Sequence, residues 1–203
     1  AFLVVLGDVK FDEVKKLVEK NFSSWKKGTL PTTKFDAPKN VTKTEINFVD
    51  MPNAVQSEIA VLSSVNLKMT DKDYFAALVA NQIFGGDFNS YLNMNLREAH
   101  GWTYGARTSI RGNKYVGKFR AGSSVRNEVT DSAVVETMKE LNRIRTEKVT
   151  PEALVTVKAT FIGNFVMDAE KPEMIARQAL LTQTQGLPAD FYQYRNKYPY
   201  LLL

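Results

Sequence analysis

The chain has 203 residues, of which 44% are hydrophobic and 24% charged, so it is long enough to bury a core without disulfides or metal. It contains no cysteine and one histidine, His100, which excludes a disulfide framework and leaves too few side chains for an ordinary zinc site. The net charge of +5 is mild, and no apolar run approaches the roughly 20 residues of a membrane helix.

The first third of the chain predicts strands around one helix. Residues 2–6 form a continuous apolar run, typical of a strand covered on both faces, and residues 12–22 carry apolar side chains at helical spacing. Residues 44–49 and 58–65 predict two further strands, separated by a turn at Pro52. The stretch 28–40, with its prolines, threonines and lysines, is a candidate flexible linker.

The middle of the chain predicts two helices and a hairpin. Residues 70–73 resemble a capping box, which opens a helix that Gly85 and Gly86 end. A shorter helix follows, with Gly101 as a left-handed cap and one aligned apolar stripe: Leu92, Leu96 and Ala99. Residues 102–111 and 115–124 then alternate as two strands across a turn, which predicts a hairpin.

The last third predicts helices. Apolar residues between 134 and 144 form one helical stripe, and Thr150 caps a second helix with Pro151 in its first turn. A third helix spans 172–185, and a fourth begins at Pro188. Strand pairs joined by tight turns, together with these helices, predict an α+β fold in which helices pack on one face of a largely antiparallel sheet.

Motifs for most kinds of catalysis are missing from this sequence. The helical H-x-x-E-H and H-E-x-x-H motifs do not occur, and no G-x-S-x-G or cysteine indicates a nucleophile. Gly85 and Gly86 precede an aspartate instead of the lysine of a phosphate-binding loop. His100, at a helix end, is best interpreted as a partner of the helix dipole.

The stretch from 99 to 127 contains several basic residues, interleaved aromatic residues and no carboxylate. One interpretation is a platform for nucleic acid; the other is a charged sheet face that resists aggregation. The absence of any recognised nucleic-acid motif favours the second interpretation. Nearby, Arg97 can be interpreted as a cation in the last turn of a helix, and Tyr104 as an aromatic residue packed in a strand. Alternatively, a fixed cation and a phenol beside a sheet edge are suited to binding a peptide backbone.

The segment GGDFNSYLNMNLREAHGWTYGARTS resembles the signature of the C-terminal, non-zinc-binding type of domain in the pitrilysin/insulinase family of zinc metallopeptidases. The opening VVLGDVKFDEVKKLVEKNFSSW and the residues around Gln56 are also similar to that domain, so the resemblance covers about residues 2–185. Ala99 and His100 stand where the family has a basic residue, which we interpret as neutral.

This resemblance implies a function. In the family, one half of a clam-shell carries the zinc motif and the other half contributes an arginine and a tyrosine that hold the substrate, which correspond here to Arg97 and Tyr104. The chain alone then binds no zinc and is inactive; the metal is expected in a zinc-bearing domain of the same polypeptide or a partner subunit. An extended peptide is the expected ligand, with no nucleic acid and no membrane span. A structural or assembly module of the same fold, without any role in proteolysis, is the alternative.

The resemblance also suggests the domain organisation and the cellular location of the protein. Residues 1–203 are interpreted as one C-terminal-type domain, and the apolar ends AFLVVL and YPYLLL suggest a piece of a longer polypeptide. A bacterial periplasm or envelope location is favoured on family habit. Regular strand alternation places Tyr104 on the face opposite Arg107 and Arg111, unless a bulge near Gly105 intervenes, so no preference for acidic substrates is predicted.

Overall fold

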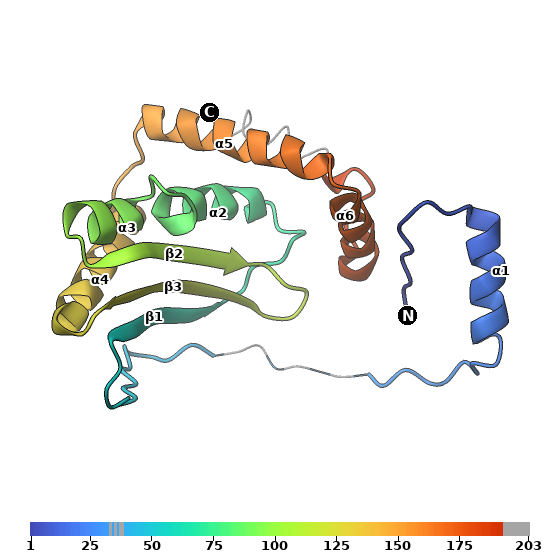
Figure 1. Cartoon of the computed structure of the whole chain (residues 1–203), viewed down its shortest axis with the longest axis horizontal. Coiled ribbons are helices and arrows are strands. Elements are labelled where there is room, and N and C mark those ends of the chain that lie inside the picture. The colour runs from blue at the N-terminus through green and yellow to red at the C-terminus, as the bar shows by residue number, and fades with distance from the viewer. Residues whose placement is uncertain (33, 35, 37–38, 193–203) are drawn as a thin grey trace.

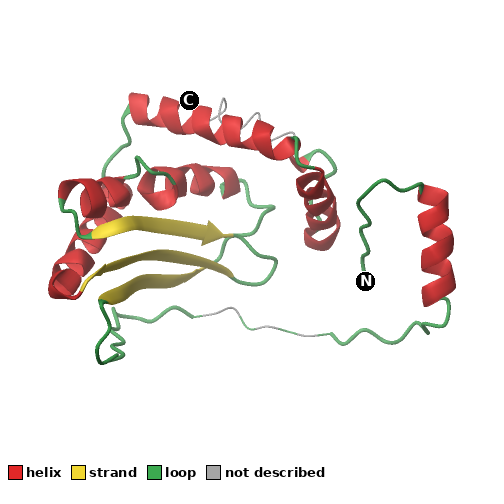
Figure 2. Ribbon diagram, viewed as in Figure 1, coloured by secondary structure: helices red, strands yellow, loops and turns green. Residues whose placement is uncertain are grey.

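Three strands form an antiparallel sheet at the centre of the computed structural model, which describes residues 1–32, 34, 36 and 39–192. The strands are β1 (Gln56–Val65), β2 (Thr103–Arg111) and β3 (Gly117–Arg126), in the order β1-β3-β2 (Figures 1 and 2). The predicted hairpin is therefore β2 and β3, and β1 pairs with the other side of β3. Both β1 and β2 are edge strands of the described sheet.

One face of the sheet holds the main core. Val125 and Ala106 are 0% exposed, and they pack with Leu96, Leu92 and Phe84 from the helical segments above them. Those segments lie on one side of the sheet in Figure 1: α2 (Tyr74–Asn81), η1 (Gln82–Gly86), α3 (Tyr91–Asn93), η2 (Met94–Ala99) and α5 (Pro151–Ala169). The predicted α+β fold, with helices on one face of an antiparallel sheet, is confirmed.

The opposite face of the sheet, which we call the open face, carries polar and charged side chains. It is formed by the residues of β3 and β1 that alternate with the core residues, among them Glu58, Lys118 and Arg120, all exposed. Gly122 lies between them, and a Cβ built there would fall 2.6 Å from an Arg120 guanidinium nitrogen. The guanidinium of Arg120 therefore lies flat over Gly122, which confirms that both belong to this face.

The helices α1 (Phe11–Phe22), α4 (Thr130–Thr146) and α6 (Pro172–Gln185) follow the sequence-based expectation. A short 3₁₀ helix that was not predicted, η3 (Asn127–Val129), precedes α4. The Thr150 side chain accepts a hydrogen bond from the backbone N–H of Ala153 and so caps α5 as predicted. Gly186 ends α6 with φ of 67°, the left-handed conformation that glycine adopts readily. The helix expected from Pro188 falls largely on residues 193–203, outside the described residues.

Two predicted strands do not form. Residues 2–6 and 44–49 are exposed and belong to no strand, and no residue of α1 is buried. A continuous apolar run becomes a strand only where a partner strand pairs with its backbone and other elements cover its faces. The described part of the chain supplies neither to these segments, so the apolar pattern alone was insufficient.

The predicted capping box at residues 70–73 is also absent. Helix α2 begins only at Tyr74, and its N-cap Asp73 makes no side-chain cap hydrogen bond. The Asp71 carboxylate instead accepts the backbone N–H of Lys68 at 2.8 Å. This local turn uses the polar side chain that the helix was expected to use, which is a known competition for aspartate.

Asn40 closes one end of the β1 edge. Its side-chain amide donates to the Ser64 carbonyl oxygen at 2.7 Å and accepts the Ser64 backbone N–H at 2.9 Å. Asn40 lies in the predicted linker 28–40, parts of which fall outside the described residues; the described parts form neither helix nor strand. The contact shows that a residue from this segment reaches the sheet.

Replacing Gly101 with alanine is expected to destabilise the protein by about 1 kcal/mol. Gly101 has φ of 64°, and nothing lies within 4 Å of a Cβ built there, so the loss is a backbone cost alone. Gly163→Ala, in the exposed middle of α5, is the matched control and is expected to stabilise by up to about 1 kcal/mol. Urea unfolding midpoints measure both changes; equal shifts of the same sign would contradict the expectation.

Candidate functional site

Arg97 and Tyr104 lie on adjoining elements, η2 and β2, joined by a tight turn. The backbone N–H of Gly101 donates to the Arg97 carbonyl oxygen, and that of Trp102 donates to the Leu96 carbonyl oxygen, both at 3.0 Å. The left-handed Gly101 lets the chain reverse there from helix to strand. The two sequence-predicted residues are thus held seven positions apart across one rigid turn, with no direct contact between their side chains among the described interactions.

The guanidinium of Arg97 is held by two neighbours. Its central carbon lies 4.5 Å from the centre of the Phe88 ring, and Nη1 lies 3.1 Å from the Glu98 carboxylate. The angle at Nη1 does not make a hydrogen bond, so this buried nitrogen has no hydrogen-bond partner among the described residues. The side chain as a whole is 35% exposed. Arg97 is therefore an oriented cation with unused donors.

Tyr104 lies in a β-bulge and is 92% exposed. Thr103 pairs with Val125 and Ala106 pairs with Ser123, so two residues of β2, Tyr104 and Gly105, stand opposite one residue of β3. The Thr103 hydroxyl accepts the Gly105 backbone N–H at 3.1 Å and lies 2.7 Å from the Ser124 carbonyl oxygen, which can accept its proton. This hydroxyl stabilises the bulge.

The bulge changes the face on which Tyr104 lies. Beyond it, Ala106 and Thr108 are buried against the helices, whereas Arg107 and Arg111 are exposed on the open face. The extra residue puts Tyr104 on the same side as Ser124, and therefore also on the open face. The expectation from regular alternation, which separated Tyr104 from the two arginines, is wrong for that reason.

Asn95 anchors the Arg97 segment to α4. Its side-chain Nδ2 donates to Glu136 and to Glu140, in both cases at 2.8 Å. The Asn95 amide, and after it Lys139, lowers the pKa of Glu136 because both stabilise the ionised carboxylate. His100 completes this end of η2, since its Nδ1 lies 3.0 Å from the Asn95 carbonyl oxygen, as expected for a residue at a helix end.

Asn93 supports both halves of the site, and it was not singled out from the sequence. It is 1% exposed, and its Oδ1 accepts the backbone N–H of Ala106 at 3.1 Å while its Nδ2 donates to the Phe88 carbonyl oxygen at 2.7 Å. It therefore ties the loop that carries the Phe88 ring to strand β2. In the sequence, Asn93 could have been noticed as a polar residue inside the apolar stripe of a short helix. Nothing in the sequence marks Phe88 as part of the site.

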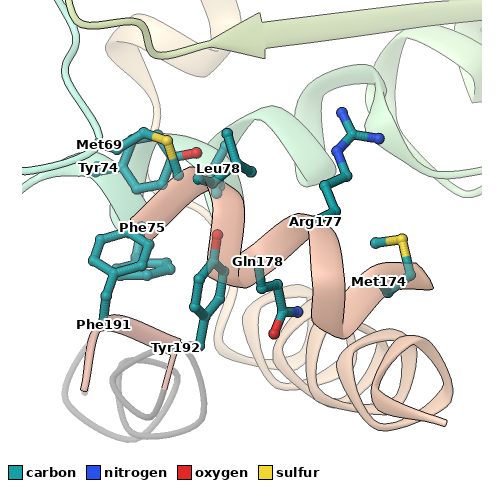
Figure 3. A pocket seen from close by; sticks show the side chains of 10 residues that line it. Met69, Tyr74, Phe75, Leu78, Met174, Arg177, Gln178, Phe191 and Tyr192 are labelled. Carbon is teal, nitrogen blue, oxygen red and sulfur yellow. The ribbon is translucent and has the colours of Figure 1, made fainter. Parts of the chain in front are cut away.

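Neither Arg97 nor Tyr104 lines either of two cavities found in the described chain. A cavity of about 190 Å³ lies between α2 and α6, where Figure 3 shows the rings of Phe75, Phe191 and Tyr192 gathered together. A second, of about 170 Å³, lies between η1 and α5. Tyr104 instead lies on open surface and Arg97 is partly exposed, which suits an extended chain better than a compact ligand.

The described residues contain no group of three or more His, Cys, Asp or Glu side chains placed to hold a metal ion. The side chains that the structure describes therefore do not form a zinc site. None of the described helices is both long and apolar enough to cross a lipid bilayer.

Comparison with known proteins finds a matching family model and a similar bacterial protein. A family model described as "Peptidase M16 inactive domain" matches residues 1–161. A protein of Bacillus subtilis (strain 168) named "Probable inactive metalloprotease YmfF" is 28% identical over 125 residues, which are 62% of this chain and 29% of that protein.

Solved structures share the fold at low sequence identity. A peptidase M16 inactive domain from Pseudomonas fluorescens superposes with a TM-score of 0.83 at 20% identity, over 97% of this chain and 46% of that one. A protease from Helicobacter pylori gives 0.74 at 19% identity, over 94% and 47%. The periplasmic protease PqqL from Escherichia coli gives 0.68 at 13%, over 96% and 22%. The chain spans less than half the length of each of these relatives.

Proposed function

The chain belongs to the family of peptidase M16 inactive domains, and from this membership we propose that it is the non-catalytic, substrate-binding part of a zinc metallopeptidase that degrades peptides. The zinc-bearing part lies elsewhere, in the same polypeptide or in a partner subunit. Residues 1–203 are then one C-terminal-type domain of a larger protein, with 28–40 as its linker. A location in the bacterial envelope belongs to the same proposal, since the similar PqqL is named a periplasmic protease.

The proposal rests mainly on the orientation and the unused hydrogen-bond donors of Arg97. Its guanidinium is oriented by Phe88 and Glu98, yet the side chain stays 35% exposed, and none of its donors has a hydrogen-bond partner among the described residues. The donors other than the buried Nη1 are therefore available to a ligand. The carbonyl oxygen of a peptide is a suitable acceptor, and Glu98 already offsets part of the positive charge.

The geometry supports binding of an extended peptide beside β2. The outer edge of β2 pairs with no described strand, so a peptide backbone can lie along it and form main-chain hydrogen bonds. The backbone amide of Ala106 would take no part in pairing with the peptide, because it already donates to Asn93. In this arrangement Arg97 donates to one substrate carbonyl oxygen, and the exposed Tyr104 hydroxyl donates to the carbonyl on which negative charge develops during cleavage.

Replacing Tyr104 with phenylalanine tests the proposal. We expect kcat/KM for a peptide substrate, measured on the full-length protein with its zinc-bearing part, to fall by about 100-fold, because one donor to the transition state is lost. Stability is expected to stay unchanged, since the side chain is 92% exposed. Tyr115→Phe, in the exposed loop between β2 and β3, is the matched control and is expected to keep full turnover.

Unchanged turnover in Tyr104→Phe would sink the substrate-binding role of this residue. In that case the assembly module, which needs the fold but no exposed phenol, becomes the better explanation. The Tyr115→Phe control guards against a general effect of removing an exposed hydroxyl.

A further inference from the structure

The open face of the sheet is strongly basic. Among the strand residues that lie on it, the only carboxylate is Glu58, and the basic residues are Arg107, Arg111, Lys118, Arg120 and Arg126. The chain as a whole has a net charge of only +5, so a large share of its excess charge is gathered on this one surface. Figure 1 shows α2, α3 and α5 on the other side of the sheet, which leaves this surface uncovered by them.

The charges on the open face differ in whether they are already paired. Arg120 Nη2 lies 2.9 Å from Glu58, and Arg126 Nε lies 3.5 Å from Glu128. Arg107 and Arg111 are exposed, and no described carboxylate lies within ion-pair distance of either. Two unpaired guanidinium groups on one strand therefore remain available to an external anion, and arginine pairs well with carboxylates.

The spacing of the free arginines matches an extended chain. Tyr104, Arg107 and Arg111 share the open face because of the bulge. Because Tyr104 and Gly105 occupy one position of the ladder, Arg107 lies about 7 Å along the strand from Tyr104 and Arg111 about 20 Å, at about 3.4 Å per position. The two arginines are four residues apart, and a neighbouring extended peptide presents side chains on one face at every second residue, so two carboxylates four residues apart can meet both.

The same face is poorly suited to nucleic acid. Single-stranded nucleic acid binding combines a basic groove with aromatic rings on which bases stack. Phe119 instead packs against Phe84 on the helix side, with ring centres 6.1 Å apart, and Tyr115 lies in the loop beyond the strands. Tyr104 is the one aromatic side chain that the three described strands place on the open face.

We propose that the open face selects acidic polypeptide substrates, with Arg107 and Arg111 pairing with two carboxylates located two and six residues from the substrate residue opposite Tyr104. This inference rests on the proposed function, which supplies the extended peptide at β2, and it adds the chemical class of that peptide. The carboxylates are held away from the bond to be cleaved, so they contribute selectivity and binding without taking part in the reaction.

The test is direct binding of two fluorescent peptides to the full-length protein, freed of zinc so that no turnover occurs. The peptides are identical except that one carries two glutamates four residues apart and the other two glutamines. We expect the glutamate peptide to bind about three- to tenfold more tightly at low salt, as exposed ion pairs allow. High salt is expected to remove most of the difference, because it screens exposed charges.

The variant R107Q/R111Q is expected to bind both peptides with equal affinity. R145Q/K148Q is the matched control: it removes two exposed charges next to the C-terminal end of α4 and is expected to keep the preference. Unfolding midpoints check that both variants fold. Neither Arg107 nor Arg111 makes an ion pair with a described residue, so no loss of stability is expected.

Three results would overturn the inference. They are equal affinity of the unaltered protein for both peptides, a preference that survives in R107Q/R111Q, and tighter binding of single-stranded DNA that is lost in R107Q/R111Q. Cleavage of the glutamine peptide, compared between the unaltered protein and Tyr104→Phe, reports on the proposed function alone. Failure of the charge selection and failure of the substrate-binding role are thereby distinguished.

Discussion

Replacing Arg97 with alanine is expected to reduce kcat/KM for peptide cleavage by the full-length protein about 100- to 1000-fold, the range found when one preorganised donor to a transition state is removed. The guanidinium is already oriented by Phe88 and Glu98, so little conformational entropy is lost when a substrate carbonyl binds to it. Steady-state kinetics on a peptide substrate measure the effect.

Two companion variants make this result specific. Arg97→Lys keeps the charge but loses the planar fork of donors, so an intermediate loss is expected. Arg145→Ala removes an exposed arginine of α4 and is expected to leave turnover unchanged. Activity of Arg97→Ala equal to that of the Arg145→Ala control would exclude Arg97 from substrate binding.

Replacing Leu96 with alanine is expected to destabilise the protein by about 3–4 kcal/mol. Leu96 is 0% exposed and packs in the main core, where its removal leaves a cavity that the rigid sheet beneath cannot fill. Met94→Ala, in the same helical segment but 42% exposed, is the control and is expected to cost less than about 1 kcal/mol.

Chemical unfolding measures both variants. Because Leu96 and Arg97 are adjacent, Leu96→Ala also separates stability from function: turnover is expected to fall only under conditions in which the protein begins to unfold. A loss of stability below about 1 kcal/mol for Leu96→Ala would show that this part of the core is loosely packed.

Much of the fold was predictable because local chemistry determines it. Thr150 and Pro151 mark the start of α5, and Gly101 adopts the left-handed conformation assigned to it. The strands at residues 2–6 and 44–49 were mispredicted because a strand depends on a partner that sequence pattern does not reveal.

The helical stripe near Arg97 was predicted only in part. Leu92 and Leu96 are buried as expected, but Ala99 is exposed. Segment η2 is a π-helix, whose hydrogen bonds reach five residues along the chain instead of four, so side chains after Leu96 leave the face that α-helical spacing assigns to them. No residue type in this segment predicts such a widened helical turn.

The surroundings of Arg97 and Tyr104 could not be predicted from the sequence. Arg97 and Tyr104 were identified from a motif, whereas the ring of Phe88, the amide of Asn93 and the bulge at Gly105 come from tertiary contacts. The bulge matters most, since a single additional residue decides which side chains share a surface with Tyr104. A hydroxyl at Thr103 stabilises it, and threonine is common in strands of every kind.

The amide of Asn40 has a consequence for self-association. By satisfying both backbone groups of Ser64, one side chain imitates the peptide unit of a neighbouring strand and blocks that position to any other chain. Two unprotected edges would let molecules pair edge to edge into fibres, whereas Asn40 on β1 leaves β2, whose Ala106 amide is bound by Asn93, as the more open edge of the described sheet. In the proposed function, a peptide can then pair with the β2 edge, while the blocked β1 edge does not pair with another copy of the chain.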